Sequence, residues 1–136
     1  MAELTLRADL GALAAIADFL AGELAGCGDD LVFAVQLAVD EACSNTILYG
    51  YPGGEAGTIT VACTIDGDTV TVTITDDGVA FDPLTAPPPR LDIPAEERPI
   101  GGLGVHFIRT VMDSVAYART GGKNVLTMEK RRAGSP

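Results

Sequence analysis

A carboxylate and an amide stand four residues apart in a stretch with helical periodicity. Glu41 and Asn45 would therefore share one face of a helix, about one turn apart. An amide oxygen there can ligate magnesium, and a carboxylate one turn earlier can accept a proton from an attacking hydroxyl. The same spacing also suits two solvated polar residues on an exposed helix face. By itself it is weak evidence for a site.

A second polar cluster, Asp76-Asp77-Gly78-Val79-Ala80-Phe81, comes directly after a predicted strand. An Asp followed by Gly at a strand end most often forms a turn. A carboxylate held there could instead accept the exocyclic amine of adenine, and the glycine would let the base approach the backbone. These residues alone leave both interpretations open.

The third cluster is Gly101-Gly102-Leu103-Gly104, which precedes an apolar stretch of helical spacing. Three glycines in four residues can be a plain flexible hinge. They can also open a helix whose first N–H groups bind phosphate. The cluster is not a Walker loop, because no Gly-Lys-Ser/Thr follows. It is not a dinucleotide-binding fingerprint, because a long loop rather than a strand precedes it.

The elements that must position these clusters begin with a short strand over residues 3–8, where apolar and polar residues alternate. Asp9 is predicted to cap a helix rich in Ala and Leu. Asp29 or Asp30 is predicted to cap a second helix, which carries the Glu and Asn pair and fades at Gly50.

The clearest strand signal is a hairpin, in which residues 59–65 and 70–74 alternate around a turn at Asp66-Gly67. Residues 78–100 hold six of the eight prolines and no sustained period, which is typical of a lid or binding loop. A helix over residues 105–112 and two strands, 114–119 and 124–130, joined at Gly121-Gly122, complete the prediction.

The composition predicts one α/β domain over residues 1–132 and a flexible tail over 133–136. A formal charge of −10 disfavours direct binding of nucleic acid or of an anionic membrane by a basic surface. The three cysteines form no CxxC pair, and no charged leader precedes an apolar run. We therefore expect a soluble, cytoplasmic protein.

The order of the clusters resembles the GHKL ATPases. The resemblance rests on Asp-Glu-Ala-Cys-Ser-Asn-Thr on a helix, Asp-Asp-Gly-Val-Ala-Phe after a strand, the proline-rich segment, and Gly-Gly-Leu-Gly before a helix. It covers about residues 3–131 and is strongest to the stand-alone bacterial anti-sigma-factor serine/threonine kinases. It implies the GHKL (Bergerat) ATP-binding fold, a two-layer sandwich of three helices on a mixed β-sheet.

The resemblance also implies roles for single residues. Glu41 matches the general base, Asn45 the magnesium ligand, and Asp76 the carboxylate that reads the adenine amine. The full nucleotide-binding set implied is Asn45, Asp76, Gly78, Ala80, Gly102, Leu103 and Gly104. Ala80 stands where the family has a second glycine. We also expect Asn124 or Thr127 to help hold the base through water.

The implied cofactors are ATP and Mg²⁺, and the implied activity is phosphorylation of a serine or threonine on a STAS-domain anti-anti-sigma partner. A sigma factor would be held when that partner is phosphorylated. Homodimerisation is common among these kinases, and nothing in the composition bears on it. Ile100 stands where some of them carry an Arg near the γ-phosphate. This departure supports the alternative of an ATP-binding module that sequesters a partner without catalysis.

Overall fold

The computed structural model describes residues 2–51, 57–82 and 108–132. The elements in chain order are β1 (Ala2–Arg7), α1 (Ala12–Glu23), α2 (Asp29–Tyr49), β2 (Thr58–Asp66), β3 (Thr69–Asp76), β4 (Ser114–Thr120) and β5 (Lys123–Arg131). Residues 108–111 form a short helical piece before β4. Most of the proline-rich segment, the Gly101–Gly104 cluster and the expected tail lie outside the described residues.

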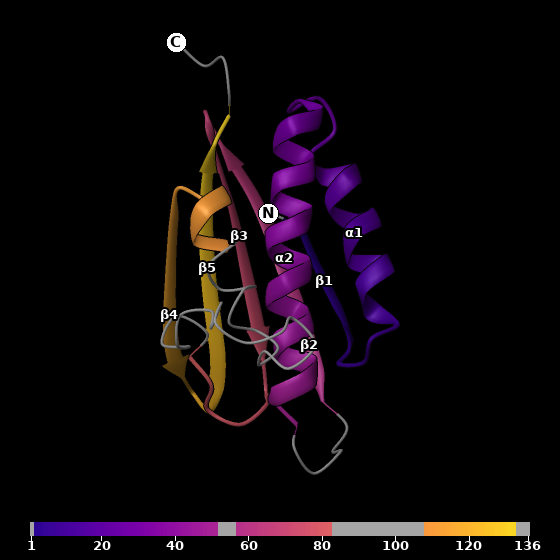
Figure 1. Ribbon diagram of the computed structural model, residues 1–136, viewed down its shortest axis with the longest axis vertical. Helices are drawn as coiled ribbons and strands as arrows, with labels where there is room; N and C mark the ends of the chain where they lie inside the picture. The colour runs from indigo at the N-terminus through magenta and orange to yellow at the C-terminus, as the bar shows by residue number, and fades with distance from the viewer. Residues whose placement is uncertain (1, 52–56, 83–107, 133–136) are drawn as a thin grey trace, which may run out of the picture.

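The five strands form one sheet in the order β1-β2-β3-β5-β4 (Figure 1). All four neighbouring pairs run antiparallel. The expected α/β sandwich is confirmed, but a mixed sheet was wrong for the described strands. The physical reason is the position of β5. β4 runs in the same direction as β3, yet the two do not pair because β5 lies between them.

The sheet buries one face, against α1 and α2, and so makes a two-layer domain (Figure 1). Along β3, Val70, Val72 and Ile74 are buried, and the threonines between them point to the other face. β2 and β5 show the same alternation. A period of two therefore sends every second side chain into a core built of Val, Ile, Leu and Ala.

Both helices begin differently from the expectation. Asp9 does not cap α1; the chain leaves β1 through a tight turn in which the Ala12 N–H donates to the Asp9 carbonyl, so the helix starts later, after Gly11. The cap of α2 is Gly28, which takes φ 99°, a conformation that an Asp rarely adopts. Asp29 and Asp30 lie in the first turn, where their negative charges interact favourably with the positive end of the helix dipole.

Helix α2 is long and apolar enough, by length and composition, to cross a membrane. In this fold it lies on the sheet and contributes Leu31, Val35 and Val39 to the core, as the core helix of a soluble protein does. The composition is therefore weak evidence for a membrane span. The helix ends at Tyr49 with Gly50 as its C-cap, as expected.

Two hairpins join neighbouring strands. The turn between β4 and β5 is the predicted glycine pair, with φ 58° at Gly121 and 78° at Gly122. Between β2 and β3 the loop residues are Gly67 and Asp68, one position later than expected, because Asp66 still pairs with Thr69. Gly67 supplies the positive φ, 62°, that this tight connection needs.

Leu20 gives a direct test of the core, because its side chain on α1 is 0% exposed. We expect Leu20→Ala to lower the free energy of unfolding by about 2–5 kcal/mol, since it removes buried methyl groups and leaves a cavity. Leu10, which is 57% exposed, is the matched control, and Leu10→Ala should cost under about 0.5 kcal/mol. Urea denaturation measures both. Equal losses in the two variants would contradict this packing.

Candidate functional site

The carboxylate of Asp76 is the centre of the site. It lies at the last residue of β3 and is only 5% exposed. Its Oδ1 accepts hydrogen bonds from the Gly78 N–H and from the Asn124 side-chain amide, both at 2.9 Å. Among the described residues, the hydrogen bonds to this carboxylate all end on Oδ1. The strand therefore ends on a buried carboxylate whose position is held by hydrogen bonds within the protein.

Burial raises the pKa of Asp76 above its ordinary value, because a charged carboxylate is poorly solvated there. The hydrogen bonds from Asn124 and Gly78 act in the opposite direction, and the Asp77 charge raises the pKa further. The Asp76 charge also affects the pKa of Cys43 on α2. Its pKa is raised to about 12, by burial first and then by neighbouring Asp carboxylates, Asp76 among them.

The end of α2 packs against the turn after β3 through two glycines. The Val79 N–H donates to the Gly50 carbonyl at 2.8 Å. A Cβ added to Gly78 would lie 2.5 Å from that same oxygen, so a side chain there would force the backbones apart. Beside this contact the rings of Tyr49 and Phe81 lie 5.9 Å apart. Gly78 is therefore required for close approach of two backbones.

Asp77 points away from Asp76 and fastens the same turn to β2. Its Oδ1 accepts hydrogen bonds from the Tyr51 hydroxyl at 2.7 Å and from the Thr58 N–H at 3.0 Å. These bonds lower the pKa of Asp77, and burial, followed by the hydrogen bond to Asp77, raises the pKa of Tyr51. The pKa values of two adjacent carboxylates are thus shifted in opposite directions. Burial raises that of Asp76, and hydrogen bonds lower that of the exposed Asp77.

Glu41 and Asn45 lie on α2, in the half that ends at Gly50 against the turn after β3. Glu41 is half-buried and its neighbour Asp40 is exposed. Asn45 is 2% exposed, and its buried Nδ2 has no hydrogen-bond partner among the described residues. The expectation of two solvated residues on an exposed face is therefore wrong for Asn45. A buried amide with an unpaired atom is a place where a bound group would be favoured.

The other expected residues divide into two groups. Ala80 is exposed, two residues beyond Gly78. Gly102, Leu103 and Gly104, which are expected to bind phosphate, lie outside the described residues, as does Ile100. The structure places Asp76, Gly78 and the half of α2 that carries Glu41 and Asn45 at one end of the domain.

Three residues of the last hairpin join the site, and the sequence pointed to only one of them. Asn124 is buried opposite Asp76 in the β3–β5 register. Its Oδ1 accepts hydrogen bonds from the Tyr117 hydroxyl and from the Arg119 guanidinium. Thr127, the other candidate for holding the base, lies on the opposite face of β5 from Asn124, away from the helices. Tyr117 and Arg119 carried no sequence signal, because strand register alone brings them here.

These residues fit a magnesium nucleotide. Among the described residues, no group of three or more His, Cys, Asp or Glu could hold a metal ion. Mg²⁺ does not need such a cage, because it usually keeps water and substrate phosphate oxygens and takes one or two protein ligands. The amide oxygen of Asn45 can be that ligand, since its unpaired Nδ2 is a donor and does not bind a cation, and the Asp76 carboxylate can accept an N–H from a base.

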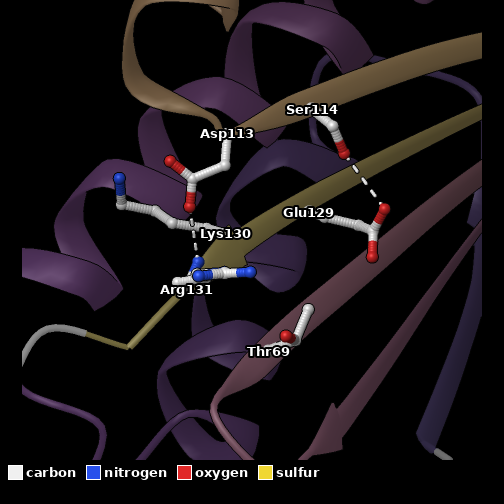
Figure 2. A pocket seen from close by; sticks show the side chains of 6 residues that line it. All are labelled: Thr69, Asp113, Ser114, Glu129, Lys130 and Arg131. Carbon is white, nitrogen blue, oxygen red and sulfur yellow. Dashed lines mark hydrogen bonds between the residues drawn. The ribbon is translucent and has the colours of Figure 1, made fainter. Parts of the chain in front are cut away.

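A separate hollow of about 260 Å³ lies at the opposite end of β5, near Arg131. Figure 2 shows two hydrogen bonds among the residues that line it, one between two side chains and one from a side chain to the backbone. The Ser114 hydroxyl bonds to Glu129 at 3.0 Å, and the Asp113 carboxylate accepts the Arg131 backbone N–H at 2.6 Å. The residues expected to bind a nucleotide do not line this hollow, so it is separate from the Asp76 end.

Comparison with known proteins agrees with this geometry. The family model described as a histidine kinase-like ATPase domain matches residues 6–130. The serine-protein kinase RsbW of Listeria innocua is 34% identical over 106 residues, which are 75% of this chain and 68% of the relative. The serine/threonine-protein kinase BtrW of Bordetella bronchiseptica is 30% identical over 103 residues, covering 76% of this chain and 72% of the relative.

A solved structure supports the fold. The histidine kinase domain of a blue-light activated histidine kinase from Erythrobacter litoralis superposes with a TM-score of 0.60 at 15% sequence identity. The superposition covers 92% of this chain and 61% of that chain. The antiparallel sheet with its two helices, the buried strand-end Asp and the match over residues 6–130 lead to one conclusion: the chain belongs to the histidine kinase-like ATPase domain family.

Proposed function

We propose that this chain is an ATP-dependent protein serine/threonine kinase of a bacterial partner-switching pathway, acting in the cytoplasm with Mg²⁺. Its substrate would be a serine or threonine on a STAS-domain anti-anti-sigma protein, and it would sequester a sigma factor when that protein is phosphorylated. The relatives named serine-protein kinases support the activity. The partners come from the family resemblance in the sequence.

The observation that carries the proposal is the buried carboxylate of Asp76 beside the end of α2. A carboxylate that is 5% exposed costs free energy to keep charged, so a protein rarely keeps one without a use or a partner. At this strand end it can accept the exocyclic N–H of adenine, which guanine cannot offer at the same position. Asn45 and Glu41 lie on the helix that packs against the same turn.

Each residue would then have one task. Asp76 binds the base and orients the nucleotide, and the Asn45 amide helps hold the metal. Glu41 accepts the proton of the attacking hydroxyl. Gly102, Leu103 and Gly104 would hold phosphate oxygens through backbone N–H groups. The bound magnesium nucleotide supplies the phosphoryl group, and the protein's contribution is position and charge neutralisation.

Asp76→Asn tests the nucleotide site. The variant keeps the shape of the side chain but loses the charge that favours a donor from the base. We expect its affinity for ATP with Mg²⁺ to fall at least about tenfold, a loss near 1.4 kcal/mol, in calorimetric titration.

The control for this measurement is Asp66→Asn, which removes an exposed carboxylate at the opposite end of the β2–β3 hairpin. Its affinity should equal that of the wild type. Equal affinity in Asp76→Asn and the wild type would remove Asp76 from the site. An absence of ATP binding by the wild type would refute the proposed function as a whole.

Glu41→Gln tests catalysis separately from binding. We expect normal ATP affinity and a rate of phosphoryl transfer to a STAS-domain partner reduced roughly 10²–10⁴-fold, because the general base is lost. Radiolabelled phosphate incorporated into the partner measures the rate. Asp40→Asn is the matched control, since Asp40 is the exposed acidic neighbour on the same helix.

The same assay separates the kinase from the non-catalytic alternative. A wild type that binds ATP, changes its affinity for the partner and transfers no phosphate would be a nucleotide-dependent sequestering module. Phosphoryl transfer at the full rate by Glu41→Gln would show that the protein is a kinase in which a group other than Glu41 accepts the proton.

A further inference from the structure

Residues from three segments close a ring of hydrogen bonds around the Asp76 carboxylate. The Asn124 amide Nδ2 donates to Asp76 Oδ1 at 2.9 Å, and the Gly78 N–H donates to the same oxygen at 2.9 Å. The Arg119 guanidinium donates both to Asn124 Oδ1 at 3.1 Å and to the Gly78 carbonyl at 2.9 Å. Every link of the ring is therefore within ordinary hydrogen-bond distance.

The Asn124 amide is fully occupied within the protein. Besides Asp76 Oδ1, its Nδ2 donates to the Val79 carbonyl at 2.8 Å. Its Oδ1 accepts from the Tyr117 hydroxyl, from Arg119, and from the Phe81 N–H at 3.3 Å. Both N–H bonds and both lone pairs are used, so no donor of this amide is left for a ligand.

The orientation of the amide is also determined by its neighbours. Exchanging its oxygen and nitrogen would bring the oxygen against two acceptors, Asp76 Oδ1 and the Val79 carbonyl. The nitrogen would then face the Arg119 and Phe81 donors. Only one orientation satisfies every group, so this amide is a fixed point in the site.

We propose that Asn124 and Arg119 are positioning residues of the nucleotide site, which hold the Asp76 carboxylate by Oδ1 so that Oδ2 is the oxygen offered to the base. The inference rests on the proposed function, in that the base is the ligand. The tip of the β4–β5 hairpin would thus act on the nucleotide indirectly, through Asp76. The atoms of Asn124 and Arg119 that form the ring are already hydrogen-bonded and do not contact the nucleotide.

The ring acts on the charge of Asp76 as well as on its position. Among the described residues, the titratable and charged groups that interact with this carboxylate are Cys43 from α2, Asp77 in its own turn, Tyr51 after α2, and Arg119 from β4. Burial and Asp77 raise the pKa of Asp76, while Asn124 and Arg119 lower it. Breaking the ring must therefore raise the pKa and make the carboxylate lose its charge at a higher pH.

The test measures the Asp76 titration directly, in the full chain without nucleotide, from the pH dependence of its side-chain carboxyl ¹³C shift. We expect Asn124→Ala to raise the midpoint by roughly one pH unit, since one strong hydrogen bond to the ionised form is lost. Arg119→Gln should raise it by less. Thr120→Ala, an exposed position on the same hairpin, is the control and should leave the midpoint in place.

A second arm measures ATP affinity against pH for the same proteins. The acid limb of binding should move to higher pH in Asn124→Ala by the shift that the ¹³C titration gives, with a smaller move in Arg119→Gln. A loss of affinity that is equal at all pH values would show a merely structural role and overturn the proposal. Arg119 is exposed, so its variant keeps the test valid even if Asn124→Ala does not fold.

The two arms separate this inference from the proposed function. Unmoved midpoints in folded Asn124→Ala and Arg119→Gln would overturn the positioning role while ATP binding by the wild type stands. If the midpoints shift in the two variants but the wild type binds no ATP, the effect of the ring on the carboxylate is supported. The role in nucleotide binding is then refuted.

Discussion

A carboxylate buried at a strand end is the constraint on which the rest of this site depends. An ionised Asp76 at 5% exposure is stable only where donors replace the lost water. One donor, the Gly78 N–H, comes from its own turn, and the other comes from Asn124, which the β3–β5 register places directly opposite. The insertion of β5 between β3 and β4 is therefore what lets the strand end carry a charge.

The same turn is fastened to the helix layer. Gly50 and Gly78 meet backbone to backbone, and Tyr51 reaches over to Asp77. Because an α-helix is rigid over two turns, fixing α2 at Gly50 also fixes Asn45 and Glu41 relative to the strand end. Helix, strand and hairpin thus hold the polar residues in one arrangement, although each lies in a different part of the chain.

Much of the fold could be predicted from local patterns. Alternation along residues 59–65 and 70–74 predicted β2 and β3, and the glycine pair predicted the last hairpin. The errors had two sources, one local and one distant. Asp9 has the chemistry of a cap, but the turn leaving β1 delays the helix. The strand directions of the sheet depend on a connection whose path no local pattern describes, so a mixed sheet was expected and an antiparallel one formed.

By itself the sequence determined the helical spacing of Glu41 and Asn45 and the Asp76-Asp77-Gly78 turn, because these depend on residue types within a few positions of each other, and it indicated the family through the order of its clusters along residues 3–131. Only the tertiary structure decided that Asp76 is buried and Asp77 exposed, that Asn45 is buried with an unpaired amide, and that Arg119 and Asn124 close a ring around the carboxylate. The hydrogen bonds from Arg119 to Gly78 and from Asn124 to Asp76 join residues 41 and 48 positions apart, which strand register and backbone contact bring close, and such separations leave no trace in a local pattern.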